Sequence, residues 1–260
     1  MSIAQINGQK LYYEDTGGKN PAVIFSHGLL MDHSMFAPQV DALRGRYRVI
    51  TWDERGHGQT NDAAAPFSYY DSADDLAALL KHLGVDQAVL AGMSQGGYLS
   101  LRAALRHPQI VRALILIDTQ AMPEAAATLP YYKQMIELWA TQGLQDQLAA
   151  TIESIILGAG YADAPAWKAK WKTVRPANLM QLFNTLATRD DISEKIGQIK
   201  VPALVIHGDA DAAIPLAHAQ DMCKRLPNAR IEVIKGAGHA SNLTHPGAAN
   251  PLIERFLAAL

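Results

Sequence analysis

Two kinds of hydrophobic pattern alternate along this chain. Short, continuous apolar runs rich in β-branched residues are followed by longer stretches in which apolar residues recur every three or four positions. The short runs are typical of strands that are buried on both faces, and the longer stretches are typical of helices with one buried side. This alternation predicts an α/β protein with a mostly parallel central sheet that is flanked by helices.

The pattern places the expected elements. Residues 2–7 and 10–15 should form a β-hairpin, because Asn7-Gly8 between them favours a tight turn. Inner strands are expected at 22–25, 47–52, 87–91, 113–117, 203–206 and 230–234. Helices are expected at 34–43, 72–83, 94–106, 216–225 and 251–260.

The alternation stops between residues 119 and 199, where no run favours a strand. This segment is rich in Ala, Gln, Leu and Met, and its prolines and glycines divide it into pieces of helical length. We therefore expect an all-helical insertion, residues 119–199, in a core that comprises residues 1–118 and 200–260. Bulky residues of the insertion are candidates for lining a substrate pocket: Tyr131, Met135, Trp139, Trp171 and Phe183.

Composition narrows the classes of function. The 260 residues are 49% hydrophobic and suffice for one sizeable core. With a net charge of −2, the chain has no excess of basic residues with which to bind a phosphate backbone, so no nucleic-acid partner is expected. No membrane-spanning run or export signal is evident, so no membrane partner is expected either. Cys223 is the single cysteine, which favours a reducing compartment and hence a cytoplasmic location. The oligomeric state stays open.

One motif points to chemistry. Gly92-Met93-Ser94-Gln95-Gly96 lies between an expected strand and an expected helix, which is the context of a G-x-S-x-G nucleophile elbow. The flanking glycines let strand and helix pack closely, and the serine then stands above a helix N-terminus. Backbone N–H groups there can hold an oxyanion, so Ser94 is the candidate nucleophile and Gln95 N–H a candidate oxyanion donor.

A nucleophilic serine needs a base and an acid that orients it. His239 follows the last expected strand and is flanked by Gly238, so it is the candidate base. Three carboxylates that follow strands remain open as the acid: Asp211, Asp209 and Asp118. The carboxyl ends of parallel strands meet at one edge of the sheet, so all these loops should open onto Ser94.

The loop after the strand 22–25 supplies the second candidate donor. Ser26-His27-Gly28-Leu29-Leu30 closes that strand with a glycine turn, and Leu29 N–H should pair with Gln95 N–H at the oxyanion. The side chain of Leu30 is then a candidate for lining the acyl pocket, and His33 is a further candidate that could reach it.

Together these segments resemble the α/β-hydrolase superfamily. The resemblance rests on His27-Gly28, Asp53-x-Arg55-Gly56-x-Gly58, Gly92-x-Ser94-x-Gly96-Gly97, Gly208-x-x-Asp211-x-x-x-Pro215 and Gly238-His239. It is strongest to small bacterial carboxylesterases and arylesterases of the haloperoxidase or perhydrolase group, and to enol-lactonases. The family pattern favours Asp211 as the acid and implies that the insertion is a cap over the active site. Gln95 and Leu29 depart from residues frequent there, namely methionine and tryptophan.

The sequence therefore predicts a serine hydrolase that cleaves a small carboxylic ester. Ser94, His239 and Asp211 would form its triad, and neither a cofactor nor a metal is implied. Hydrolysis of a lactone or enol-lactone, carbon–carbon bond hydrolysis and perhydrolysis are alternatives on the same triad. A ligand-binding receptor with a vestigial triad is the alternative of a different class, because a fold does not fix a function.

Overall fold

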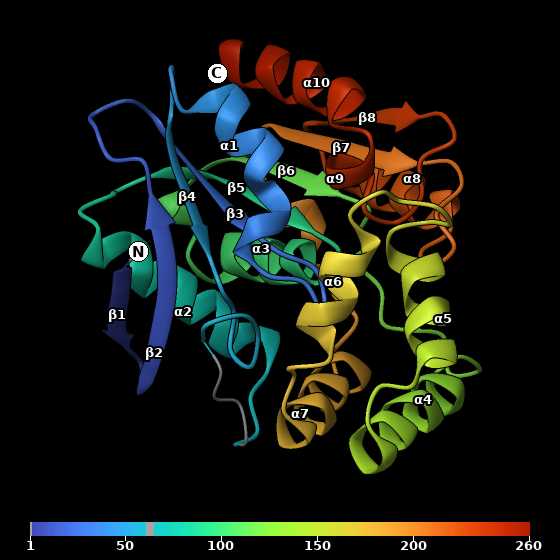
Figure 1. Cartoon of the computed structure of the whole chain (residues 1–260). Helices are drawn as coiled ribbons and strands as arrows, with labels where there is room; N and C mark the ends of the chain where they lie inside the picture. Colours follow the sequence, from blue (N-terminus) through green and yellow to red (C-terminus); the bar gives the residue numbers. More distant parts are fainter. Residues whose placement is uncertain (1, 61–64) are drawn as a thin grey trace.

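A central sheet with helices on both faces organises the molecule (Figure 1). The computed structural model describes residues 2–60 and 65–260, and within them the sheet has eight strands in the order β1-β2-β4-β3-β5-β6-β7-β8. β1 and β2 form the expected hairpin, β2 pairs with β4 antiparallel, and every other pairing is parallel. The strands span Ser2–Ile6 (β1), Gln9–Asp15 (β2), Ala22–Ser26 (β3), Arg48–Trp52 (β4), Ala88–Met93 (β5), Val111–Ile117 (β6), Ala203–Gly208 (β7) and Ala229–Ile234 (β8).

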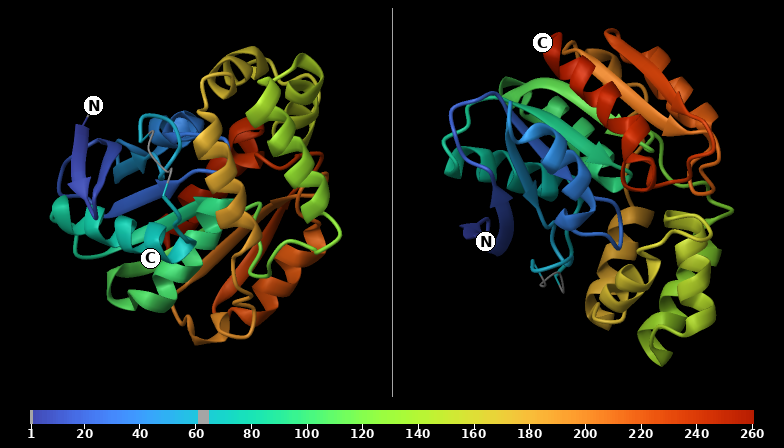
Figure 2. Two further views of the ribbon diagram at one scale, coloured as in Figure 1. Left: turned by 90° about the horizontal axis from the view of Figure 1, so that it is seen from below. Right: turned by 45° about the horizontal axis from the view of Figure 1, so that its top comes forward.

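The helices of the core form a layer on each face of this sheet (Figures 1 and 2). One layer contains α2 (Tyr69–His82), α3 (Gln95–Arg106) and α8 (Leu216–Arg225). The other contains α1 (Ala37–Leu43), α9 (Ser241–Thr244) and α10 (Pro246–Ala258). Three short 3₁₀ helices are also described: η1 (His33–Phe36) and η2 (Pro108–Ile110) in the core, and η3 (Ile196–Gln198) at the end of the segment 119–199.

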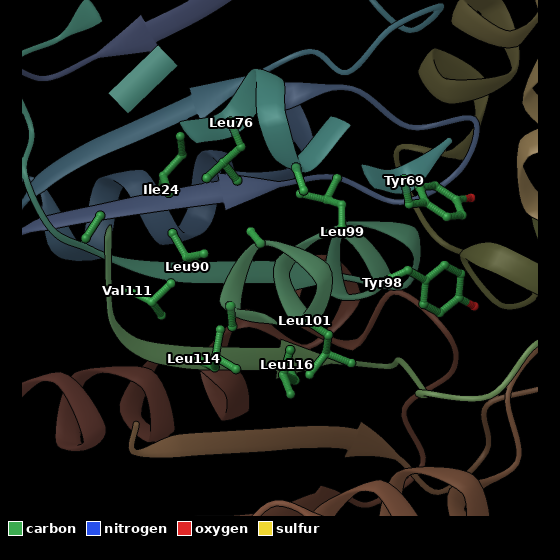
Figure 3. Packing of buried hydrophobic residues seen from close by; sticks show 14 of the residues in the cluster. Ile24, Tyr69, Leu76, Leu90, Tyr98, Leu99, Leu101, Val111, Leu114 and Leu116 are labelled. Atoms are coloured by element: carbon green, nitrogen blue, oxygen red, sulfur yellow. The ribbon is translucent and has the colours of Figure 1, made fainter. Parts of the chain in front are cut away.

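The parallel strands are buried on both faces, as their continuous apolar runs predict. Along β3, Ile24 faces the layer of α2 and α3, whereas its neighbour Phe25 faces the layer of α1 and α10. Figure 3 shows the first of these clusters, in which Leu90 and Leu114 of the sheet pack beneath α3. Successive side chains of a strand point to opposite faces, so one strand contributes to both cores.

The insertion lies between β6 and β7 and contains the helices α4 (Leu129–Gln142), α5 (Asp146–Ile156), α6 (Ala164–Trp171) and α7 (Pro176–Ala187). The described residues 119–199 form no strand, as expected. The four helices stand together on one side of the sheet, apart from the two covering layers (Figure 2). Within the described residues, no helix is long and apolar enough to cross a bilayer.

Several expected helix boundaries are wrong, and proline explains the two largest differences. The helix expected at 34–43 is divided into η1 and α1, because Pro38 has no N–H with which to continue a helical ladder. The last helix starts at Pro246 instead of residue 251, and Pro251 lies inside it. Pro246 occupies the first helical turn, where a missing N–H costs nothing.

Candidate active site

Ser94 occupies the turn between β5 and α3 with a left-handed backbone, φ 52° and ψ −116°. A non-glycine residue in this region is strained and persists only where its surroundings hold it. Its N–H donates to Ile117 O at 2.9 Å, and its carbonyl accepts from Thr119 Oγ1 at 2.7 Å. A Cβ atom at Gly92 would stand 2.1 Å from Gly96 O, so only glycine allows β5 and α3 to approach this closely.

His239 and Asp211 complete a chain of hydrogen bonds from this serine. His239 Nε2 lies 3.0 Å from Ser94 Oγ, and His239 Nδ1 lies 2.8 Å from Asp211 Oδ2. The other oxygen of Asp211 accepts from Ala213 N at 2.8 Å and Ile214 N at 2.9 Å. These two bonds fix the carboxylate so that the imidazole is held with Nε2 toward the serine.

The other two candidate acids have different partners. Asp209 accepts a hydrogen bond from Gly236 N at 2.6 Å at the surface. Asp118 directly follows β6 with a φ of 47°, and its carboxylate accepts from Gly208 N at 2.9 Å and Ser241 N at 2.8 Å. Asp118 therefore bridges the loop that contains Asp211 to the loop that follows His239.

Burial and charge shift the pKa values of these groups in opposite directions. Burial alone lowers the pKa of His239, but the carboxylates of Asp211, Asp118 and Glu124 outweigh it, so the pKa of His239 lies above its usual value. Burial would raise the pKa of Asp211, but His239 and the loop N–H groups keep it below its usual value. Burial is also the main cause that raises the pKa of Asp118 to about 7.

Two backbone N–H groups beside Ser94 are free to bind a ligand atom. Within residues 2–60 and 65–260, neither Leu29 N nor Gln95 N donates a hydrogen bond. Gln95 begins α3, where the first N–H groups have no partner within the helix. A Cβ atom at Gly28 would stand 3.6 Å from Ser94 Cβ, so the loop that contains Leu29 lies against the serine.

The side chain of Gln95 points away from this space into a buried network. Its Nε2 donates to Glu54 Oε2 at 2.6 Å, its Oε1 accepts from Tyr69 O–H at 3.3 Å, and Ser72 Oγ donates to Glu54 Oε1 at 2.5 Å. Burial raises the pKa of Glu54 to about 8. His57 packs against His27 beside this network, with Nδ1 3.0 Å from Arg55 O.

A cavity opens in front of Ser94 and His239. The volume that the centre of a water molecule can occupy in it is about 110 Å³, which is several times the ~10–15 Å³ that one water needs. Core loops and all insertion helices except α6 contribute to its walls, which are mainly aliphatic and aromatic. The expected pocket residues Leu30, Met135, Trp139 and Phe183 line it, and so does Leu29, the candidate oxyanion donor.

Three expected pocket residues do not line this cavity. Tyr131 is 52% exposed, and its neighbour Tyr132 lines the cavity instead. A spacing of four advances about 40° around a helix at each step, so Tyr131 points about 80° away from Trp139, whereas Tyr132 lies about 20° from it. Trp171 is fully buried, and its Nε1 donates to Leu30 O at 2.8 Å.

His33 is the third. Its Nδ1 and its backbone N–H both contact Asp53 Oδ1, at 2.8 Å and 2.7 Å. It lines a second cavity of about 280 Å³, which shares Leu30 and Leu182 with the first.

Sequence reasoning missed several residues of the first cavity. Tyr98 follows Ser94 by four residues, one helical turn, and that spacing could have found it. Figure 3 shows Tyr98 and Tyr69 side by side at the end of the core cluster, with ring centroids 5.6 Å apart. Glu124 belongs to an irregular segment before α4, where no periodic signal exists.

Among the residues that the structure describes, two groups of acids and histidines have potential metal-ligand atoms within 4.8 Å of one another: Asp32, His33 and Asp53, and Asp118, His207 and Asp211. Protein partners already occupy both groups. Lys170 Nζ binds Asp32 at 2.7 Å, and His239 binds Asp211. Neither group faces the space in front of Ser94 Oγ.

Comparisons with known proteins agree with this architecture. The family model described as alpha/beta hydrolase fold matches residues 21–246. The chain belongs to the α/β hydrolase fold family. It is a hydrolase enzyme of that family.

Relatives of this hydrolase differ in their described activity. A putative non-heme chloroperoxidase of Synechocystis sp. is 30% identical over 99% of each chain. The structure of an enol-lactonase from Burkholderia xenovorans LB400 superposes with a TM-score of 0.91 at 26% identity, covering 99% of this chain and 100% of that one. The structure of a thermophilic esterase from Thermogutta terrifontis gives a TM-score of 0.88 at 26% identity, covering 96% of this chain and 94% of that one.

Proposed function

We propose that this hydrolase cleaves small carboxylic esters through an acyl-enzyme on Ser94. The observation that carries the proposal is the chain of two hydrogen bonds from Ser94 Oγ through His239 to Asp211, at 3.0 Å and 2.8 Å. A strained serine at a helix N-terminus, a histidine within hydrogen-bond distance and a carboxylate behind it meet the geometric requirements of nucleophilic catalysis.

Each group then has one task. Ser94 Oγ attacks the ester carbonyl carbon while His239 Nε2 takes the hydroxyl proton, and the carbonyl oxygen becomes an oxyanion. The unpartnered N–H groups of Leu29 and Gln95 receive this oxyanion, and such a donor is worth about 10²–10³ in rate. His239 gives the proton to the departing alcohol, and water then releases the acid by the reverse steps. Asp211 stabilises the imidazolium throughout.

The insertion acts as the cap of this site in our proposal. Trp139, Ile152 and Phe183 of three insertion helices line the cavity opposite Ser94 and His239. A closed apolar pocket gains about 0.8 kcal/mol for each methylene that it accommodates and rejects chains that exceed it. Esters with acetyl to butyryl groups should therefore be preferred.

A lactone or enol-lactone is the second candidate substrate. The similarity to the enol-lactonase of B. xenovorans, with a TM-score of 0.91, favours it. Ring opening requires the same nucleophile, base and oxyanion donors, and differs only because the leaving alcohol stays attached to the acyl group.

The experiment is a comparison of kcat/KM for p-nitrophenyl esters from C2 to C16 and for a set of lactones. We expect C2 to C4 esters to exceed C8 and longer ones by at least about tenfold. In Ser94→Ala, turnover should fall by about 10⁵–10⁶ while the circular dichroism spectrum is retained. A maximum at C8 or beyond contradicts the closed pocket, and a lactone turned over far faster than every ester makes ring opening the activity.

A further inference from the structure

Charge is distributed unevenly around the cavity in front of Ser94. Among the described residues that line it, Glu124 is the single carboxylate, and neither lysine nor arginine is present. Behind this wall lies the cationic side chain of Arg189, whose Nη2 donates to Glu124 Oε1 at 3.0 Å. Arg189 is nearly inaccessible, with 2% of its side chain exposed against 11% for Glu124.

Arg189 is also held by contacts with residues other than Glu124. Its Nη1 donates to Leu186 O and its Nη2 to Met122 O, both at 3.0 Å, and its guanidinium carbon lies 4.2 Å from the ring centroid of Tyr98. The guanidinium is therefore hidden behind Tyr98 and Glu124, which both face the cavity. A bound molecule meets the carboxylate of the pair and not the cation.

These features disfavour a bound anion in two ways. An anion that enters an apolar cavity loses its hydration, which costs far more than the transfer of a neutral group of the same size. It also meets the like charge of Glu124, and Arg189 behind that carboxylate is already paired with it. The charge of Glu124 is near enough to His239 to raise the pKa of its imidazole, so it acts across the site.

We infer that this site selects acyl groups that carry no carboxylate, and that Glu124 contributes to the selection by occupying Arg189. The inference rests on the proposed ester hydrolysis and names the substrate class within it. Neutral esters and lactones are substrates, and compounds of equal shape that bear a second carboxylate are rejected.

Two esters that share a skeleton test the substrate class. Methyl 4-methylpentanoate and monomethyl succinate have the same leaving group and the same number of non-hydrogen atoms, and they differ by an isopropyl group in place of a carboxylate. We expect kcat/KM of the full-length wild-type chain, measured by pH-stat at pH 8, to be at least about 100-fold higher for the neutral ester. A ratio near one overturns the inference and leaves ester hydrolysis standing, whereas turnover of neither ester overturns the proposed function itself.

Glu124→Gln tests the role of the residue. The amide keeps an acceptor for Arg189 but removes the negative charge, so a substrate carboxylate no longer meets a like charge and the charge of the guanidinium behind it is no longer neutralised. The ratio of the two kcat/KM values should then fall by at least about tenfold, through a gain on monomethyl succinate. The melting temperature reports folding of the variant, and the ratio cancels any effect that is common to both esters. The wild-type ratio tests the substrate class without the variant.

Glu137→Gln is the matched control. Glu137 lies on α4 with 51% of its side chain exposed, pairs with Lys133 at 3.7 Å and does not line the cavity. This substitution removes the same unit of charge from the same insertion, and the ratio of kcat/KM for the two esters should stay within about twofold of wild type. An equal fall of the ratio in both variants overturns the role of Glu124, because net charge alone would then explain the selection.

Discussion

Trp171 Nε1 donates a hydrogen bond of 2.8 Å to the carbonyl oxygen of Leu30, the residue after the proposed oxyanion donor Leu29. Leu30 has a φ of 63°, a left-handed conformation that is costly for a bulky side chain. Next to it, Lys170 Nζ binds Asp32 at 2.7 Å and Ser34 Oγ at 2.6 Å. Helix α6 of the insertion thus holds the loop that presents Leu29 N–H.

Trp171→Phe should lower kcat by about tenfold with little change in KM. Without the indole N–H, the strained loop relaxes and Leu29 N–H moves from the oxyanion, and loss of such a donor costs up to about 10²–10³. Trp167→Phe is the control, because Trp167 is buried on the same helix one turn earlier. Steady-state kinetics of the two variants decide, and equal losses in both would assign the effect to packing alone.

Substitutions of Asp211 and Asp118 should have different effects on kcat. Asp211→Asn removes the charge that orients His239 and should lower kcat by about 10³–10⁴. Asp118→Asn removes one of two acceptors that bridge Gly208 N and Ser241 N, so it should cost less than tenfold in kcat but measurably lower the melting temperature. A larger kinetic loss for Asp118→Asn would transfer the role of the acid to the end of β6.

The pH dependence of kcat/KM should follow the titration of His239. As the base it must be neutral, so kcat/KM for a neutral ester should rise with pH and level off. Because the net effect of nearby carboxylates places the pKa of His239 above 6.5, the midpoint should lie above that value. In Asp211→Asn the midpoint should move to lower pH, since the largest favourable charge is gone. A profile flat from pH 5 to 9, with chemistry rate-limiting, excludes an imidazole base.

Glu54 should give a second pH effect, on stability. Its pKa is raised from 4.5 to about 8, so between these values the folded state retains a proton that the unfolded state has lost. The free energy of unfolding therefore falls as pH rises through this window. Between pH 5 and 8.5, urea unfolding should show a decrease that is at least about 1 kcal/mol smaller in Glu54→Gln than in wild type. Equal decreases would mean that Glu54 ionises normally.

The sequence predicted what local patterns determine. Continuous apolar runs predicted the strands that are buried on both faces. The glycines around Ser94 predicted the turn between β5 and α3 that holds this serine. The choice among Asp118, Asp209 and Asp211 needed the family resemblance, because all three follow strands and only the loop conformations give them different partners.

The pocket was less predictable because its walls come from distant segments. Tyr131 and Tyr132 are neighbours of equal chemistry, and only the rotation of α4 decides which of them faces the cavity. His33 binds Asp53 from a strand end 20 residues away, a pairing with no periodic signal. Arg189 and Glu124 are likewise 65 residues apart and meet only after the insertion folds.

Reaction with a fluorophosphonate tests the central claim most directly, because it reports the nucleophile independently of the substrate. Intact-mass spectrometry and peptide mapping of the inactivated protein should find one phosphonyl group per chain, on Ser94. Labelling should be abolished in Ser94→Ala and strongly slowed in Asp211→Asn, since Asp211 orients the base that activates the hydroxyl. Labelling at another residue, or an active protein that resists the reagent, would contradict the account.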